Sequence, residues 1–193
     1  MPSVRRNPDA LRAIGWGGLI GGALDISDAL VFYGTRGVPP ERLLQGIAKG
    51  LVGTRAMLGG WVTATLGLGL HFVIAFGAAA VYYAASRKFG MLRNRPVVSG
   101  LLYGVAVFLF MNMIVVPLSA IHRSPAAMLA FSVVSANAVL ALMLFIGLPI
   151  ALAVNRYASK PSASFECRPE VLHNSPVGRS RIGRGGRNLT RKP

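Results

Sequence analysis

Acidic residues and cysteine are scarce in this sequence. Asp and Glu together number six among 193 residues, against 21 Lys and Arg, so the formal net charge is +15. The one cysteine, Cys167, excludes an intrachain disulfide and any cysteine-rich metal site. The motifs HExxH and GxSxG are also absent, which removes the usual signatures of zinc peptidases and serine hydrolases.

Charged residues are nearly missing from four long stretches. Hydrophobic residues make up 53% of the chain and charged residues 14%, with a mean hydropathy of +0.52. Each stretch covers the ~20 apolar residues needed to cross a bilayer, and backbone groups in lipid must be bonded internally, as in a helix. The alternating ~10-residue segments of a β-barrel are not visible. We therefore predict an all-α fold: an integral membrane bundle over residues 11–155, with four transmembrane helices at about 13–33, 59–85, 97–117 and 126–154.

Three segments outside the four stretches have their own character. Residues 1–10 are a short polar leader, and residues 156–193 are a Pro-, Gly-, Ser- and Arg-rich tail that we expect to be disordered, because it cannot bury a core. Residues 40–52 begin with proline and carry apolar side chains at helical spacing: Leu43, Leu44, Ile47, Leu51 and Val52. This pattern predicts either an interfacial or re-entrant helix or a surface helix that shields the connection, and we favour the second.

Basic residues are divided unevenly between the two sides of such a bundle. With both termini in the cytoplasm, sixteen Lys and Arg lie on the inner side and five on the outer side. Without the long tail the margin narrows to seven against five. The positive-inside rule therefore favours an orientation with both the N-terminus and the C-terminus inside.

Glycine is concentrated on one face of the first stretch. At about 100° per residue, four glycines and two aspartates fall within an arc of roughly 140°, and bulky side chains occupy the rest. The four form two overlapping GxxxG pairs, which allow close approach of another helix. The second stretch has a matching small or polar face that includes His71. The predicted packing residues are Gly17, Gly18, Gly21, Gly22, Gly60 and Gly67.

Five polar side chains stand out inside the apolar stretches. Asp25 and Asp28 share the glycine face of the first stretch, and His71 lies near the middle of the second. With alternating directions, Asn112 and Asn137 reach the same central-to-outer half of the bilayer. Each central Asp costs roughly 2.5–3.5 kcal/mol on insertion, whereas a Leu, Ile, Val or Phe returns about 0.3–0.6. The first stretch should therefore insert poorly without a partner helix.

Two interpretations of these five residues stay open at the level of sequence. Carboxylates and a histidine suit a cation or proton site in a small transporter-like protein or accessory subunit. Alternatively, the polar groups only pack helices through hydrogen bonds of ~1 kcal/mol or less, in a structural or assembly protein. An intramembrane zinc enzyme using Asp25, Asp28 and His71 is less favoured, because short loops leave little room for a substrate. We expect no catalytic residues, cofactor or metal.

The expected partners follow from composition. The apolar stretches require a lipid bilayer, and the tail carries nine Lys and Arg that suit anionic lipid headgroups. We expect headgroups rather than nucleic acid at the tail, although both are polyanionic. A second copy of the chain or another membrane protein is a further candidate partner.

Three segments resemble small uncharacterised bacterial inner-membrane proteins with four helices. They are GGALDISDALVFYGTRGVPPERLLQGIAKGLVG, LGLGLHFVIAFGAAAVYYAASR and MNMIVVPLSA. The similarity spans about residues 13–155 and excludes the tail. It implies a multi-pass protein of the bacterial cytoplasmic membrane. It implies no particular activity, so no functional residue is transferred from it.

Overall fold

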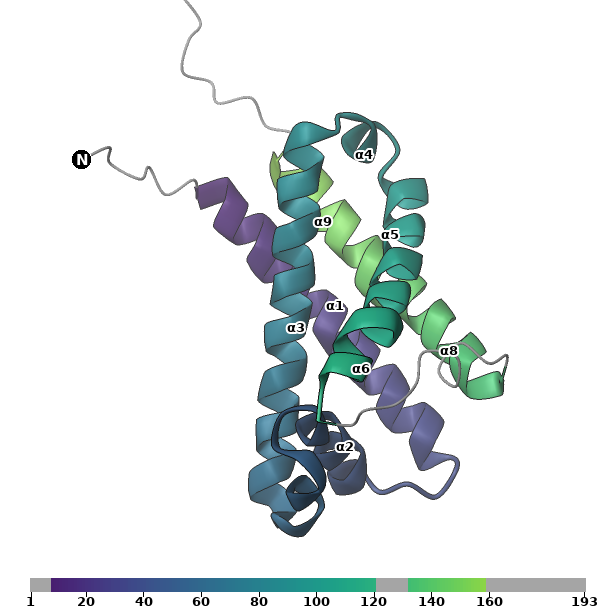
Figure 1. Ribbon diagram of the computed structural model, residues 1–193. Coiled ribbons are helices and arrows are strands. Elements are labelled where there is room, and N and C mark those ends of the chain that lie inside the picture. The colour runs from purple at the N-terminus through teal and green to yellow at the C-terminus, as the bar shows by residue number, and fades with distance from the viewer. Residues whose placement is uncertain (1–7, 121–131, 159–193) are drawn as a thin grey trace, which may run out of the picture. The chain divides into compact units, whose positions relative to one another are not determined.

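The computed structural model describes residues 8–120 and 132–158, of which 91% are helical and none belongs to a strand. Figure 1 shows the order of the elements. The first half contains α1 (Pro8–Gly34), α2 (Pro40–Val52), the 3₁₀ turn η1 (Gly53–Leu58) and α3 (Gly60–Lys88). The second half contains α4 (Met91–Asn94), α5 (Pro96–Phe110), η2 (Met111–Val115), α6 (Val116–Leu118), α8 (Val133–Ala141), η3 (Leu142–Gly147) and α9 (Leu148–Ala158).

Four helical segments in the described residues are long and apolar enough to cross a membrane. They are Pro8–Gly34, Gly60–Lys88, Pro96–Leu118 and Val133–Tyr157. The prediction of an all-helical chain with four membrane-length helices is therefore confirmed. We refer to α5, η2 and α6 together as the third span, and to α8, η3 and α9 together as the fourth span.

The ends of the helices differ from the expected bounds in three places. The first helix begins at Pro8, so residues 8–10 of the predicted leader are helical. The fourth span begins at Val133, later than the expected residue 126, because Ser132 has an extended backbone and caps the helix with Ser135 in a capping box. Residues 126–131 lie outside the described residues. So does the predicted tail, apart from residues 156–158, which continue α9.

Each of the last two spans contains one wider π turn, and each turn ends two residues before a proline. η2 ends at Val115, before Pro117, and η3 ends at Gly147, before Pro149. A proline in a helix has no N–H for the preceding turn, and its ring crowds the carbonyl four residues earlier. The helix accommodates this loss by widening locally. The proline in each of these spans thus coincides with a π turn.

Helix α1 packs between α3 and the fourth span, and its two glycine pairs face different neighbours. Gly17 and Gly21 face the fourth span. A Cβ at Gly17 would lie 3.3 Å from Ile150 Cα, and a Cβ at Gly21 would lie 3.1 Å from the Phe145 carbonyl oxygen. A Cβ at Gly22 would lie 3.0 Å from Ala75 on α3, and one at Gly18 would overlap the ring of Phe76. The overlapping GxxxG pairs therefore seat α1 against two helices at once.

Helix α2 packs against the first half of α3. Leu44, Gln45 and Ala48 are buried in this contact, and a Cβ at Gly67 would overlap the Leu44 carbonyl oxygen. Leu51 and Val52, which belong to the expected apolar stripe, are exposed. The buried face is thus rotated from the apolar stripe, because Gln45 turns inward to donate through Nε2 to the Gly60 carbonyl at 3.0 Å.

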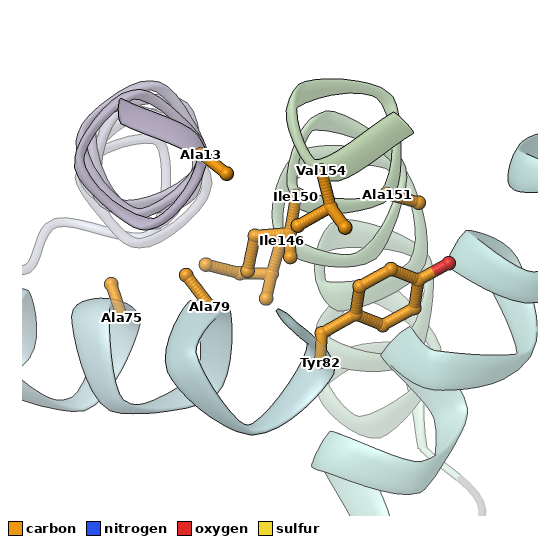
Figure 2. Packing of buried hydrophobic residues seen from close by; sticks show 8 residues of the cluster. All are labelled: Ala13, Ala75, Ala79, Tyr82, Ile146, Ile150, Ala151 and Val154. Atoms are coloured by element: carbon orange, nitrogen blue, oxygen red, sulfur yellow. The ribbon is translucent and has the colours of Figure 1, made fainter. Parts of the chain in front are cut away.

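A core of small and branched side chains holds the opposite end of the four helices together. Figure 2 shows Ala13, Ala79 and Tyr82 around Ile150 and Val154. The hydroxyl of buried Tyr82 donates to the Leu92 carbonyl at 3.2 Å and lies 2.9 Å from Ser99 Oγ. This network ties α3 to the start of α5 through the turn that contains α4.

Candidate functional site

One cavity of about 370 Å³ lies between all four long helices and α2. Its walls come from the C-terminal half of α1, the middle of α3, the second half of the third span and the first half of the fourth. All five polar residues selected from the sequence line it: Asp25, Asp28, His71, Asn112 and Asn137. The remaining lining residues are apolar except Tyr33. The structure therefore brings the five polar residues together around one cavity. Ion binding by these residues stays a prediction.

Asp28 is tied to the fourth span. Asn137 Nδ2 donates to Asp28 Oδ2 at 3.0 Å, across 109 positions of sequence. Both side chains are partly buried. The bond joins α1 to α8 from side chain to side chain, which is the geometry expected of an interhelical packing contact.

His71 is tied to α1 through a backbone carbonyl. Its Nε2 lies 2.9 Å from the Gly22 oxygen. Because a carbonyl can only accept, Nε2 carries the hydrogen in this contact, and Nδ1 is the acceptor of the neutral ring. The absence of a side chain at Gly22 lets α3 approach closely enough for this bond. Phe72 packs edge-on against the imidazole, with ring centroids 5.5 Å apart.

Asn112 bonds within its own helix. Its Nδ2 donates to the Phe108 carbonyl at 2.8 Å, one turn earlier and beside the π turn η2. The amide oxygen of Asn112 accepts no hydrogen bond from the described residues. An amide oxygen in a cavity is a ligand suited to a hard cation.

Asp25 differs from the other four residues. It is partly buried and lines the cavity, yet it accepts no hydrogen bond from residues 8–120 or 132–158. Its electrostatic neighbours are His71 and Asp28. No hydrogen bond joins Asp25 to His71 in the described part of the chain, although the two side chains share the cavity. A partly buried carboxylate without a hydrogen-bond donor is costly unless a proton or a cation neutralises it.

The residues that the structure describes contain no cluster of three metal-binding side chains. Nowhere in the described ranges do three His, Cys, Asp or Glu side chains lie close enough together to bind a metal ion. The zinc-enzyme hypothesis requires three such ligands from Asp25, Asp28 and His71.

The predicted packing glycines also separate into two kinds. Gly67 and the four glycines of α1 lie at close helix contacts. Gly60 lies at the first residue of α3 with φ +56°, and a Cβ there would meet only Glu41 Oε1, at 3.8 Å. A positive φ is a conformation that favours glycine, so Gly60 is required by the backbone turn rather than by helix packing.

The sequence carries no clear signal for the burial of Gln45 or the partial burial of Tyr103. Gln45 is almost fully buried, and its Oε1 has no partner among the described residues. Tyr103, on α5, donates to the Ala78 carbonyl at 2.7 Å. An isolated Gln next to an apolar stripe is a weak signal of burial, and an interfacial Tyr has the same sequence signature as a buried one.

The fold and the cavity together define a class: in its described residues, an all-helical protein with four membrane-length helices around a largely apolar cavity that also contains the five polar side chains. Comparison with known protein families, characterised proteins and solved structures finds no match to the chain.

Proposed function

We propose that the chain is a multi-pass protein of the bacterial cytoplasmic membrane, with both termini inside. Helices of 23–29 residues extend roughly 34–44 Å at ~1.5 Å per residue, enough to cross ~30 Å of hydrocarbon. Large apolar side chains are exposed on all four helices, among them Val31, Val73, Leu102 and Leu140. Such extensive apolar exposure is typical of surfaces that contact lipid. The bacterial location rests on the resemblance of residues 13–155, and the orientation on the distribution of Lys and Arg.

Within that membrane protein, the cavity binds a proton or a small cation, as in a transporter-like protein or an accessory subunit. The observation that carries this proposal is Asp25, a carboxylate in the cavity with no hydrogen-bond donor in the described part of the chain. Asn112 offers an amide oxygen to the same space, and Nδ1 of His71 offers a proton acceptor. Helix packing alone leaves Asp25 unexplained.

A second candidate function is structural. The Asp28–Asn137 bond and the His71–Gly22 bond join α1 to the fourth span and to α3. Both hydrogen bonds are expected in a protein whose polar groups serve only to pack its helices together. On this account the protein assembles with a second copy or with another membrane protein, and its basic tail holds anionic headgroups.

Thermal unfolding of the purified wild type and of Asp25→Asn distinguishes the ion-site function from the structural function. The probes are NaCl, KCl and LiCl at constant ionic strength, and a series of pH values. A ligand that binds only the folded state raises the unfolding temperature. We expect at least one cation, or protons, to shift unfolding of the wild type, and Asp25→Asn to remove that shift while the variant still folds.

The matched control is Asp9→Asn, because Asp9 is a partly exposed aspartate on the same helix, 4.0 Å from Arg12 and not part of the cavity lining. It should keep the shift. If the unfolding temperature of the wild type changes with no cation and with no change of pH, the ion site is refuted and the structural function is favoured. An undiminished shift in Asp25→Asn would exclude Asp25 as the ligand.

A further inference from the structure

One end of the helical bundle is rich in unpaired basic side chains. The core cluster brings together the start of α1, the end of α3, α4 and the end of α9. Six exposed cations belong to these segments and to the start of α5: Arg12, Arg87, Lys88, Arg93, Arg95 and Arg156. Among the described residues, Asp9 is the one acidic side chain at this end, and its contact with Arg12 is a loose 4.0 Å.

Two of the four basic residues at the other end are engaged by the protein, whereas Lys49 and Arg55 have no such contact among the described residues. Arg36 donates to the Phe32 carbonyl at 2.8 Å and lies over the Phe32 ring at 3.6 Å. Arg42 donates to the Met57 carbonyl at 3.2 Å. These two cations are bound to the protein itself. The cations near α4 make no hydrogen bond to the described residues, which leaves them available to an external anion.

An apolar groove opens beside Arg12. It has a volume of about 390 Å³ and lies between α1 and α3, lined by Leu11, Arg12, Gly15, Trp16, Leu19 and Phe76. A Cβ at Gly15 would meet nothing within 4 Å, so the glycine widens the groove. Trp16 lies one helical turn from Arg12 toward the middle of α1. Trp at such a position is typical of the zone between headgroups and acyl chains.

We propose that this groove binds an anionic phospholipid. The phosphate pairs with the Arg12 guanidinium, since arginine matches a phosphate through two parallel donors, and one acyl chain lies along Leu11, Leu19 and Phe76. The surplus of cations at this end selects lipids with net negative charge over zwitterionic ones. The inference rests on the membrane insertion proposed above, but not on the ion site in the cavity.

The test counts bound lipid by native mass spectrometry of the full chain, with phosphatidylglycerol and phosphatidylcholine as the probes. The wild type should retain phosphatidylglycerol in preference. Arg12→Gln should weaken that binding about fivefold, as expected for the loss of one cation near a phosphate. Gly15→Leu should weaken it at least as much by filling the groove.

Gly77→Leu is the matched control. Gly77 lies on α3, where an added Cβ would meet nothing within 4 Å, in a separate groove of about 550 Å³ whose lining has no charged residue. It should leave phosphatidylglycerol binding unchanged. Four results would each overturn the lipid site. The wild type could retain the two lipids equally, or Gly77→Leu could reduce phosphatidylglycerol binding as much as Gly15→Leu does. Inorganic phosphate alone could displace the bound phosphatidylglycerol, or the groove could prove to be a dimer contact that Gly15→Leu disrupts.

Membrane fractionation with an alkaline wash keeps the two proposals apart. Release of the wild type by the wash would refute membrane insertion, and the lipid site with it. Retention of the wild type without selectivity for phosphatidylglycerol would refute the lipid site alone. All variants are compared by thermal unfolding first, so that only folded protein enters the lipid measurement.

Discussion

Asp25 and Asp28 lie three residues apart on one helix and line one cavity, yet they have different surroundings. Asp28 accepts a hydrogen bond from Asn137 at 3.0 Å, whereas Asp25 has His71 and Asp28 as electrostatic neighbours and no donor in the described chain. Asp28 thus takes part in a packing contact between helices, whereas Asp25 is an acceptor without a donor among the described residues. This asymmetry is the basis of the proposal that Asp25, rather than Asp28, binds a proton or a cation.

The Asp28–Asn137 bond should make a small, measurable contribution to stability. In a double-mutant cycle with Asp28→Ala and Asn137→Ala, we expect a coupling free energy of about 0.6 kcal/mol, and at most ~1.7, because interhelical hydrogen bonds in membranes fall in that range. Unfolding in mixed micelles of increasing SDS content measures it. Strict additivity of the two substitutions would show that the bond contributes nothing.

At the scale of residues, part of the site was predictable from the sequence. Asp25, Asp28 and His71 stood out because the stretches around them contain almost no other ionisable group. The partner of His71 was not predictable, since a backbone carbonyl such as that of Gly22 leaves no mark in the sequence. Burial of Gln45 was missed for a related reason: its partner is also a carbonyl, that of Gly60.

At the scale of elements, glycine decides how closely the helices approach. α2 meets α3 at Gly67, and the third and fourth spans meet at Gly100, Gly104 and Gly147. At each of these positions an added Cβ would overlap or press against backbone atoms of the neighbouring helix. Backbone cannot rotate away as the end of a flexible side chain can, so the whole helix would have to shift.

The α2–α3 contact gives a sharp prediction with an internal control. Gly67→Ala places a methyl group against the Leu44 carbonyl, and we expect it to destabilise the protein by about 3 kcal/mol. Gly69→Ala, two residues along the same helix, meets nothing within 4 Å and should be neutral or up to ~1 kcal/mol stabilising. Thermal unfolding in detergent compares them, and equal effects would contradict the packing of α2 on α3.

The existence of the long helices was predictable, whereas their irregularities were less so. Long apolar runs with almost no charged residue indicated all four helices. Whether a helix kinks or widens into a π turn before Pro117 and Pro149 depends on its neighbours, which the local sequence does not specify. The start at Val133 was missed because Ser132 caps the helix with Ser135, an unusual acceptor at that position in a capping box.

At the scale of the whole molecule, the proposed orientation puts α4 on the cytoplasmic side of the membrane and η1 on the outer side. Leu58 is 88% exposed at the end of η1, and Met91 is 72% exposed in α4. In a Cys167→Ser background, a membrane-impermeant maleimide should label Leu58→Cys in intact cells. It should label Met91→Cys only after permeabilisation. The reverse pattern would show that the proposed orientation is inverted.

The central claim is that Asp25 exchanges a proton or a cation inside the folded protein, and infrared difference spectroscopy tests it most directly. Spectra of the membrane-reconstituted chain are recorded as pH or the concentration of NaCl, KCl or LiCl is changed. We predict a change in the carboxyl absorption that disappears in Asp25→Asn and persists in Asp9→Asn. Spectra of the wild type and of Asp25→Asn that coincide under every condition would contradict the claim.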